Sequence, residues 1–168
     1  MGTKIGYKLF EMNKEGKLYP LFINKKESIP IGEWIEDQNV PAKGFSVRPG
    51  WHLGMIPDAP WLKNHEGYYK SRWKTGKRVW GIVEFVDDID YQYEVNLLPQ
   101  KCMKDRIPEN GFYRFREAGG REWIITGKIR VVQILTEEER KLILQDENYN
   151  EHAEFAPYQA RFEKRMAK

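Results

Sequence analysis

Residues 79–86, with the sequence VWGIVEFV, decide the fold of this chain. The run is rich in β-branched and aromatic residues, which is typical of a well-buried β-strand. We therefore predict that it is the central strand of a sheet. The acidic stretch that follows, Glu84 to Glu94, lacks the ligand spacing of an EF-hand loop, so we interpret it as a solvated strand end with no metal site.

Further extended runs lie on both sides of this strand. Residues 5–12 and 17–23 are apolar and aromatic, and the NKEG between them suits a tight reversal, which predicts a hairpin with Pro20 on an edge strand. Three more strands are expected at residues 111–116, 122–126 and 128–135, with glycines marking the turns between them. Residues 29–36 fit either a short turn of helix or a bent strand.

The pattern changes to helical at Thr136. The sequence TEEE places a capping threonine three residues before Glu139, which predicts a helix start, and an apolar stripe predicts a second helix over about residues 157–167. We expect an α+β fold: one β-rich domain over residues 1–136, with mixed or mainly antiparallel sheets. A C-terminal helical segment, residues 137–168, would pack on it or extend from it.

Composition excludes several classes of protein. The 168 residues suffice for a core without a metal or a disulfide, and the single cysteine, Cys102, excludes an internal disulfide and a Cys-based zinc cluster. No stretch approaches the length of a membrane span and the start lacks a secretory signal, so we expect a cytoplasmic protein with no membrane partner. The net charge of +3 is too small to name a partner. The sequence leaves the oligomeric state open.

The segment Gly44–Leu62 contains three residue types suited to a nucleotide pocket. Arg48 and His52 flank a Pro-Gly corner that would bring them together. Arginine suits a phosphate, histidine can donate to a ribose hydroxyl, and Trp51 can cover a flat ring. The alternative is structural: Arg48 pairs with an acid, His52 bonds a loop carbonyl and Trp51 fills the core.

A basic and aromatic window, residues 63–78, forms a second candidate site. Lysines, arginines and aromatic rings alternate there, as in loops that track phosphates and stack on bases. The alternative is an ordinary solvated loop. The candidate residues of this window for binding nucleic acid or a partner are Lys70, Arg72, Trp73, Lys74, Lys77 and Arg78.

Two family resemblances follow from these motifs. The order YKLF, LYPLFI, GEW, GF..RPGWH, DAP.L, RVW..VE and KIRVV resembles uncharacterised proteins of phages and mobile elements, over most of residues 5–135. More remotely, residues 44–86 are similar to the small ADP-ribosyltransferases that inactivate rifampicin, whose late strand has the form seen here as VWGIVEF. That resemblance implies an ADP-ribosyltransferase-like fold and NAD as the cofactor.

Glu84 is the candidate catalytic carboxylate, because transfer of ADP-ribose passes through an oxocarbenium-like state. If it faces a cleft opposite His52, the two would be catalytic, with Arg48, Trp51 and Tyr68 binding the nucleotide. If Glu84 meets Arg78 or Arg48 in a salt bridge, it is structural. The competing hypothesis is a non-catalytic phage counter-defence or regulatory module that binds a host protein or nucleic acid through residues 63–78.

Overall fold

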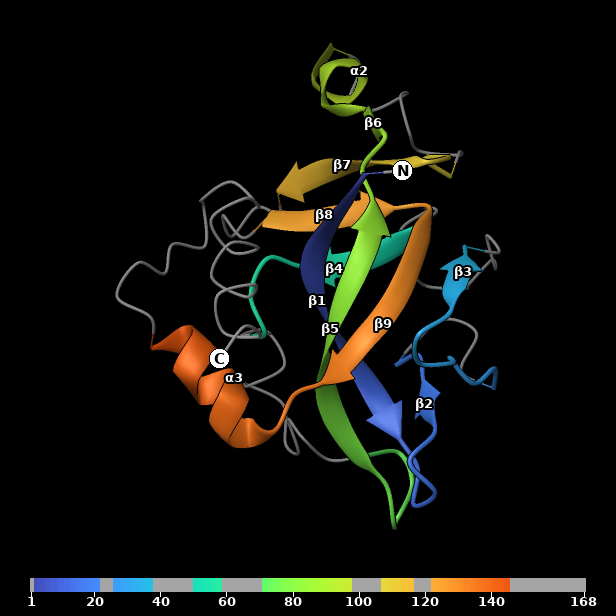
Figure 1. The fold of residues 1–168 in the computed structure, drawn as a ribbon, viewed down its shortest axis with the longest axis vertical. Coiled ribbons are helices and arrows are strands. Elements are labelled where there is room, and N and C mark those ends of the chain that lie inside the picture. The colour runs from blue at the N-terminus through green and yellow to red at the C-terminus, as the bar shows by residue number, and fades with distance from the viewer. Residues whose placement is uncertain are drawn as a thin grey trace.

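The chain folds into a β-rich α+β structure with an open, mixed sheet (Figure 1). The computed structural model describes residues 2–21, 26–37, 50–58, 71–97, 107–116 and 122–145. Its strands and helices are β1 (Thr3–Met12), β2 (Leu18–Tyr19), β3 (Trp34–Glu36), β4 (Trp51–Gly54), β5 (Lys77–Val86), β6 (Ile89–Asp90), α2 (Gln92–Leu97), β7 (Gly111–Arg116), β8 (Glu122–Thr126), β9 (Lys128–Ile134) and α3 (Glu137–Leu144).

Strands β1 and β5 form the centre of the sheet. They pair antiparallel along ten residues each, from Thr3 opposite Val86 to Met12 opposite Lys77. Strand β5 also pairs with β9, so its backbone is bonded on both sides and most of its side chains are buried. The prediction that residues 79–86 form a central strand is confirmed, and the strand extends two residues further toward the N-terminus.

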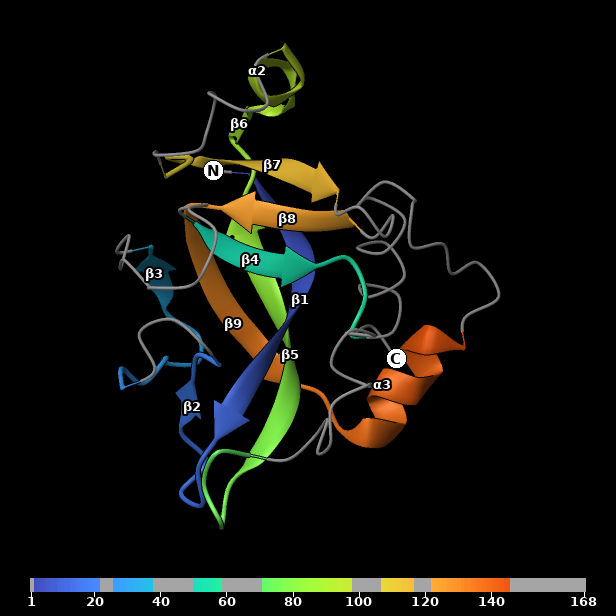
Figure 2. The same ribbon diagram turned by 180° about the vertical axis from the view of Figure 1, so that it is seen from behind.

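The sheet is strongly curled. Its strand order is β3-β9-β5-β1-β4-β8-β7-β6, with β2 paired to β1 outside this path. Only Gly127 separates β8 from β9 in the chain, yet three strands lie between them in the sheet. The sheet must therefore bend until its β8 and β9 ends meet, and Figure 2 shows β4 and β8 crossing over the pair β1 and β5.

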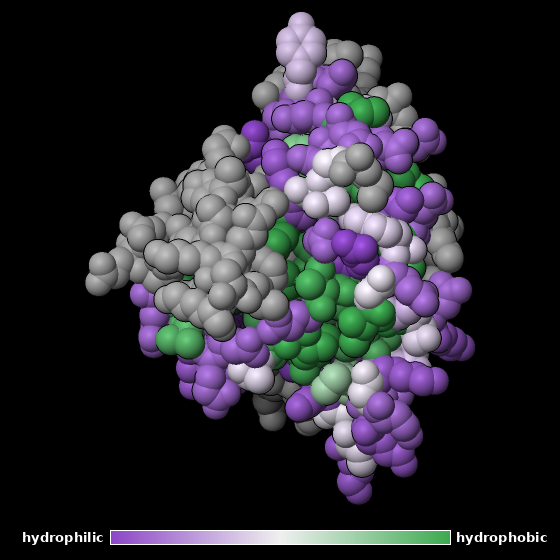
Figure 3. All heavy atoms as spheres, in the orientation of Figure 1, coloured by the Kyte–Doolittle hydropathy of each residue, from purple (hydrophilic) through white to green (hydrophobic). Residues whose placement is uncertain are grey.

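The curl encloses the larger hydrophobic core. Buried side chains from β1, β4, β5, β7, β8 and β9 meet on its inner side, among them Phe10, Leu53, Phe85, Ile124 and Val131. Because side chains alternate along a strand, a second set lies on the outer face, including Tyr7, Trp80 and Ile82. Hydrophobic side chains also gather at the centre of the face seen in Figure 3, over β5 and β9.

Several elements agree with the sequence prediction. The hairpin of β1 and β2, the strands β7, β8 and β9, and the helix α3 are all present. Helix α3 begins with the expected capping box, in which Thr136 accepts from the Glu139 amide and the Glu139 side chain accepts from the Thr136 amide. Arg140 fixes this helix to the main body, because its guanidinium donates to the Pro57 carbonyl and to Asp58. The second predicted helix lies outside the described residues.

Two parts of the chain differ from the prediction. Strand β4, at Trp51–Gly54, is not among the strands that the sequence analysis expected. The acidic stretch after β5 continues into β6 and α2, and the Asp90 side chain accepts from the Gln92 amide at the start of that helix. For residues 29–36 the sequence fitted either a turn of helix or a bent strand, and the structure shows a strand at residues 34–36.

Neither described helix is long and apolar enough to cross a bilayer.

Candidate functional site

Glu84 is paired with an arginine on the neighbouring strand. It lies directly opposite Arg130 in the ladder between β5 and β9, and the Arg130 Nη2 donates to the Glu84 Oε1 at 2.9 Å. The same guanidinium lies 4.8 Å from the centre of the Trp34 ring. Glu84 thus forms the salt bridge that the sequence analysis weighed as the structural alternative, although with a different arginine from the two considered there.

The structure does not bring Glu84 close to His52. Strand β1 separates their strands, and Tyr7 of β1 is level with both Gly54 and Ile82. Two strand spacings, about 10 Å, therefore separate the backbones of β4 and β5 where Tyr7 faces both, and the side chain paired with Glu84 is Arg130.

The start of β4 holds a partly buried polar cluster. The Lys8 Nζ donates to the His52 carbonyl at 3.0 Å and lies 5.8 Å from the centre of the Trp51 ring. The Asp37 carboxylate accepts from the Gly50 amide at 2.8 Å. Burial lowers the pKa of Lys8 to about 8, although the charge of Asp37 acts in the opposite direction. The sequence analysis did not single out Lys8 or Asp37.

Trp51 and His52 take different roles in this cluster. Trp51 packs against the inner core, as the structural alternative expected, while His52 pairs with Ile125 of β8 and is half-buried. Gly50 before them has a φ of 126°, and a Cβ there would lie 2.6 Å from the Ile125 side chain. Arg48, Tyr68 and Lys70, the remaining predicted residues of the two sites, lie outside the described residues.

The structure brings together more of the predicted residues of the second candidate site than of the first. Arg72, Lys74 and Lys77 are exposed on the segment that leads into β5. Because Met12 pairs with Lys77, this segment lies beside the turn between β1 and β2, which carries exposed Lys14 and Lys17. We call this surface the basic tip and define it by Lys14, Lys17, Tyr19, Arg72, Trp73, Lys74 and Lys77.

Three of the seven residues of the basic tip, Lys14, Lys17 and Tyr19, were missed from the sequence. Lys14 and Lys17 are far from residues 63–78 in the chain, and only the pairing of β1 with β5 brings them together. The available signal was the NKEGK turn itself, whose two lysines flank a hairpin reversal. In the described part of the chain, the four lysines of the tip have no ion-pair partner, which leaves their charges available to a ligand.

A buried carboxylate fixes the base of the tip. Glu11 of β1 is only 1% exposed and accepts hydrogen bonds from Ser71 Oγ, the Arg72 amide and Arg78 Nε. Arg78, predicted as a binding residue, is therefore engaged in an internal salt bridge at 3.0 Å. The Trp73 amide in turn donates to Ser71 Oγ. These bonds hold the segment 71–73 against β1.

Arg72 and two aromatic rings form a stack on the tip. The Arg72 guanidinium lies 4.4 Å from the centre of the Trp73 ring and 5.9 Å from that of Tyr19, within the range of cation–π attraction. The two rings meet edge to face, with centroids 5.0 Å apart. Arg72 Nη1 also donates to the Pro20 carbonyl at 3.1 Å. The guanidinium is thereby held in one orientation while the residue remains exposed.

The chain matches no protein-family model, no curated protein and no solved structure. Among the described residues, no group of three or more His, Cys, Asp or Glu side chains is placed to hold a metal ion. The function therefore has to be argued from the arrangement of the side chains themselves.

Proposed function

We propose that this protein is a nucleic-acid-binding module and that the basic tip is its contact surface. The observation that carries the proposal is the placement of unpaired lysines from two separate turns around one ordered arginine and aromatic stack. Cationic side chains that track a phosphate backbone, combined with rings, are the elements that nucleic-acid-binding surfaces use.

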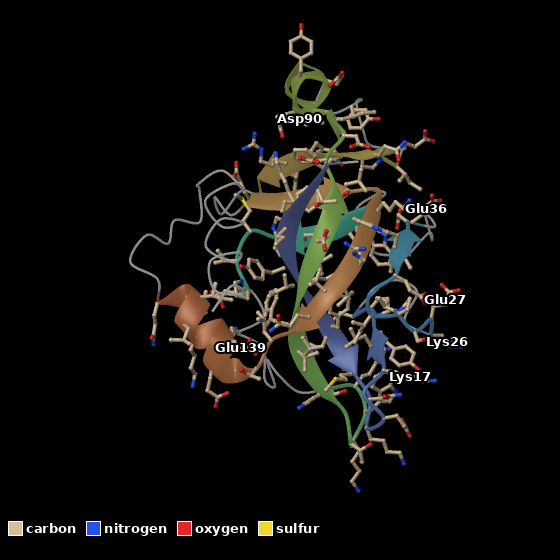
Figure 4. All side chains as sticks on the ribbon, viewed as in Figure 1. Lys17, Lys26, Glu27, Glu36, Asp90 and Glu139 are labelled. Atoms are coloured by element: carbon tan, nitrogen blue, oxygen red, sulfur yellow. The ribbon has the colours of Figure 1, made fainter. Side chains whose placement is uncertain are left out.

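The charge of the tip favours a polyanion. Its two turns carry five exposed bases and one exposed acid, Glu15, which gives a net charge of +4 (5 − 1). Exposed Asp88, Asp90 and Glu94 lie close together in the chain, and Figure 4 places Asp90 far from Lys17. The exposed pair Lys26 and Glu27, which Figure 4 places near Lys17, adds no net charge. A surface with a net positive charge attracts an anionic chain.

The basic tip is also rigid where contact would occur. The bonds to Glu11 and to the Pro20 carbonyl order the Arg72 and Trp73 segment before any ligand binds. A surface that is already ordered loses less conformational entropy on binding than a free loop does. This supports a binding surface over the ordinary solvated loop that the sequence analysis kept as its alternative.

The resemblance to an ADP-ribosyltransferase requires a carboxylate near His52 beside a nucleotide cleft. Glu84 is held by Arg130 and is separated from His52 by a strand. We therefore place the finer ADP-ribosyltransferase-like fold and NAD binding second to the binding function. Release of nicotinamide from NAD by the purified protein would reverse this order.

Salt dependence tests the proposal directly. Fluorescence anisotropy would measure binding of labelled DNA and RNA oligonucleotides over a range of KCl concentrations. We expect log K to fall linearly with log salt, with a slope of about −3 for a single strand contacting four to five bases. The double variants Lys14→Ala/Lys17→Ala and Lys74→Ala/Lys77→Ala should each reduce the magnitude of that slope by about 1.4.

A charge-matched control separates the tip from the net charge. Lys128→Ala/Lys141→Ala also removes two positive charges, but from residues outside the basic tip. This control should keep the original slope. Absence of binding to DNA and RNA at low salt, or an equal loss in the control, would contradict the proposal. Binding of an acidic protein but no nucleic acid would point to the alternative host-protein partner.

A further inference from the structure

Lys8 lies in a cluster of groups from three separate parts of the chain. It belongs to β1, the Trp51 ring and the His52 carbonyl belong to β4, and the Asp37 carboxylate follows β3. On β5, the residue opposite Lys8 is Gly81, which has no side chain that could compete for the amine. The Lys8 side chain is partly exposed, so solutes can approach it from solvent.

The groups around Lys8 stabilise its positive charge poorly. An ammonium has three N–H donors, and Nζ donates to one described acceptor, the His52 carbonyl at 3.0 Å. Within the described ranges, no carboxylate forms an ion pair with it. Asp37 attracts the charge from further away, and the Trp51 ring, at 5.8 Å, is near the limit of cation–π attraction. Burial outweighs these attractions and lowers the pKa of Lys8 to about 8.

The same contacts leave the lone pair of the neutral amine unused. A carbonyl oxygen only accepts, so His52 holds the amine through an N–H and not through the nitrogen lone pair. A carboxylate and the face of an indole ring likewise donate no proton to that lone pair. Because side chains alternate along β4, the His52 imidazole lies on the opposite face from Trp51. The described neighbours therefore position the amine without occupying its reactive electrons.

We propose that Lys8 is a nucleophilic site that forms a Schiff base with small uncharged aldehydes. A lysine whose amine is desolvated is the kind that enzymes use for this chemistry. The Asp37 carboxylate disfavours an aldehyde that itself carries a negative charge. This site lies outside the basic tip and does not depend on the binding of nucleic acid.

The reaction requires only the amine and the aldehyde. The nitrogen lone pair attacks the carbonyl carbon, the π electrons move to the oxygen, and one N–H proton reaches that oxygen through solvent to give a carbinolamine. The lone pair on nitrogen then forms the C=N bond while the C–O bond breaks. The hydroxyl leaves with the second N–H proton as water. The products are one imine and one water molecule, and no oxidant or reductant is consumed.

Reductive labelling of the unchanged protein tests the proposal. Benzaldehyde with sodium cyanoborohydride converts each imine into a stable benzylamine, and peptide mass spectrometry measures the rate at every lysine. Exposed Lys14 and Lys17 are internal references in the same sample. At about pH 7.5, an amine with a pKa of about 8 has a neutral fraction roughly 200 times that of an ordinary lysine. A less basic amine is also a weaker nucleophile, so we expect labelling at Lys8 to be about tenfold faster.

The pH dependence distinguishes a lowered pKa from simple accessibility. The neutral fraction of Lys8 is nearly complete above about pH 9, whereas that of the references still rises. The ratio of the rate at Lys8 to the rate at Lys14 or Lys17 should therefore fall by more than about tenfold between pH 7.5 and pH 10. The ratio cancels the effect of pH on the reductant.

Asp37→Asn tests the role of the neighbouring charge. The change removes the group that raises the pKa of Lys8, while the amide oxygen can still accept from the Gly50 amide. Labelling at Lys8 should therefore become severalfold faster at about pH 7. The matched control is Glu36→Gln, which removes the same charge from an exposed neighbour and should leave the rate unchanged.

A charged aldehyde tests the proposed class of substrate. With 4-carboxybenzaldehyde, the preference for Lys8 over the two references should be smaller than with benzaldehyde, and Asp37→Asn should restore it. Labelling at Lys8 that is no faster than at Lys14 and Lys17, or a rate ratio that does not fall with pH, would overturn the proposal. Both results come from the unchanged protein, so they decide the matter even if a variant does not fold.

Discussion

Glu11 and Arg78 lie directly opposite each other on β1 and β5, and the Arg78 Nε donates to the Glu11 Oε1 at 3.0 Å. The carboxylate is buried, and two further donors, from Ser71 and Arg72, complete its hydrogen bonding. This pair joins the core of the sheet to the basic tip, so it affects both stability and the order of the proposed binding surface.

Removing the carboxylate should be costly. Glu11→Ala leaves the Arg78 guanidinium and two other donors without their acceptor, and we expect the free energy of unfolding to fall by about 3 to 5 kcal/mol. Urea denaturation followed by circular dichroism would measure this loss. The double variant Glu11→Met/Arg78→Met should lose clearly less than the sum of the two single variants, because it leaves no uncompensated charge. Additive losses would mean that the two side chains act independently.

Lys8 should make stability depend on pH in the alkaline range. The pKa of Lys8 is lowered to about 8 by burial in the fold, against 10.5 as the ordinary value. Between these pH values the unfolded chain keeps the proton that the folded chain has lost, so the contribution of Lys8 to stability rises with pH. Below pH 8 both states are protonated, and this contribution is constant and unfavourable.

The comparison with Lys8→Met isolates this effect from other titrating groups. The groups facing the Lys8 ammonium are the Asp37 carboxylate, the His52 carbonyl and the Trp51 ring. The free energy of unfolding of the unchanged protein minus that of Lys8→Met should rise by at most about 3 kcal/mol between pH 8 and pH 10.5. Denaturation series at several pH values would measure it. A difference that stays flat across this range would show that Lys8 is not desolvated.

Gly50 should tolerate no side chain. Gly50→Ala combines an unfavourable φ of 126° with a Cβ placed 2.6 Å from the Ile125 side chain. The matched control is Gly16→Ala, where φ is also positive, at 84°, but no atom lies within 4 Å of the added carbon. We expect about 1 kcal/mol of destabilisation at Gly16 and at least about twice that at Gly50, measured by thermal unfolding. Equal losses of stability in the two variants would mean that the Ile125 side chain moves away from the added carbon at little energetic cost.

The sequence predicted the elements whose signals are local. The hairpin turn NKEG, the β-branched run of β5 and the capping box of α3 each depend on neighbouring residues, and each is present in the structure. Strand β4 has no such signal. Its four residues, WHLG, become a strand because they pair with β8 on one side and with β1 on the other.

The partner of Glu84 could not be predicted for a related reason. The ladder of β5 and β9 runs from Ile82 opposite Gln133 to Val83 opposite Val131, so Val132 is an additional residue in a bulge. Without that bulge, Val131 would face Glu84 and Arg130 would face Phe85. A shift of one residue changes every partner beyond it, and no pattern in the sequence marks its position. Lys14 and Lys17 joined the basic tip through the same kind of distant pairing.

The curled sheet also determines how this chain must reach its native state. Its central ladder joins residues about 75 positions apart in the chain, as with Tyr7 and Ile82, and the pairs of β4 with β8 are likewise about 70 positions apart. Closing loops of that length costs entropy before any burial compensates for it, and proteins of such high contact order fold in milliseconds to seconds. The β7–β8 hairpin, in contrast, pairs residues that are close in the chain, from Phe112 opposite Thr126 to Arg116 opposite Glu122. It can therefore form early, whereas the basic tip, which needs β1 and β5 together, can form only once the slow pairing is complete.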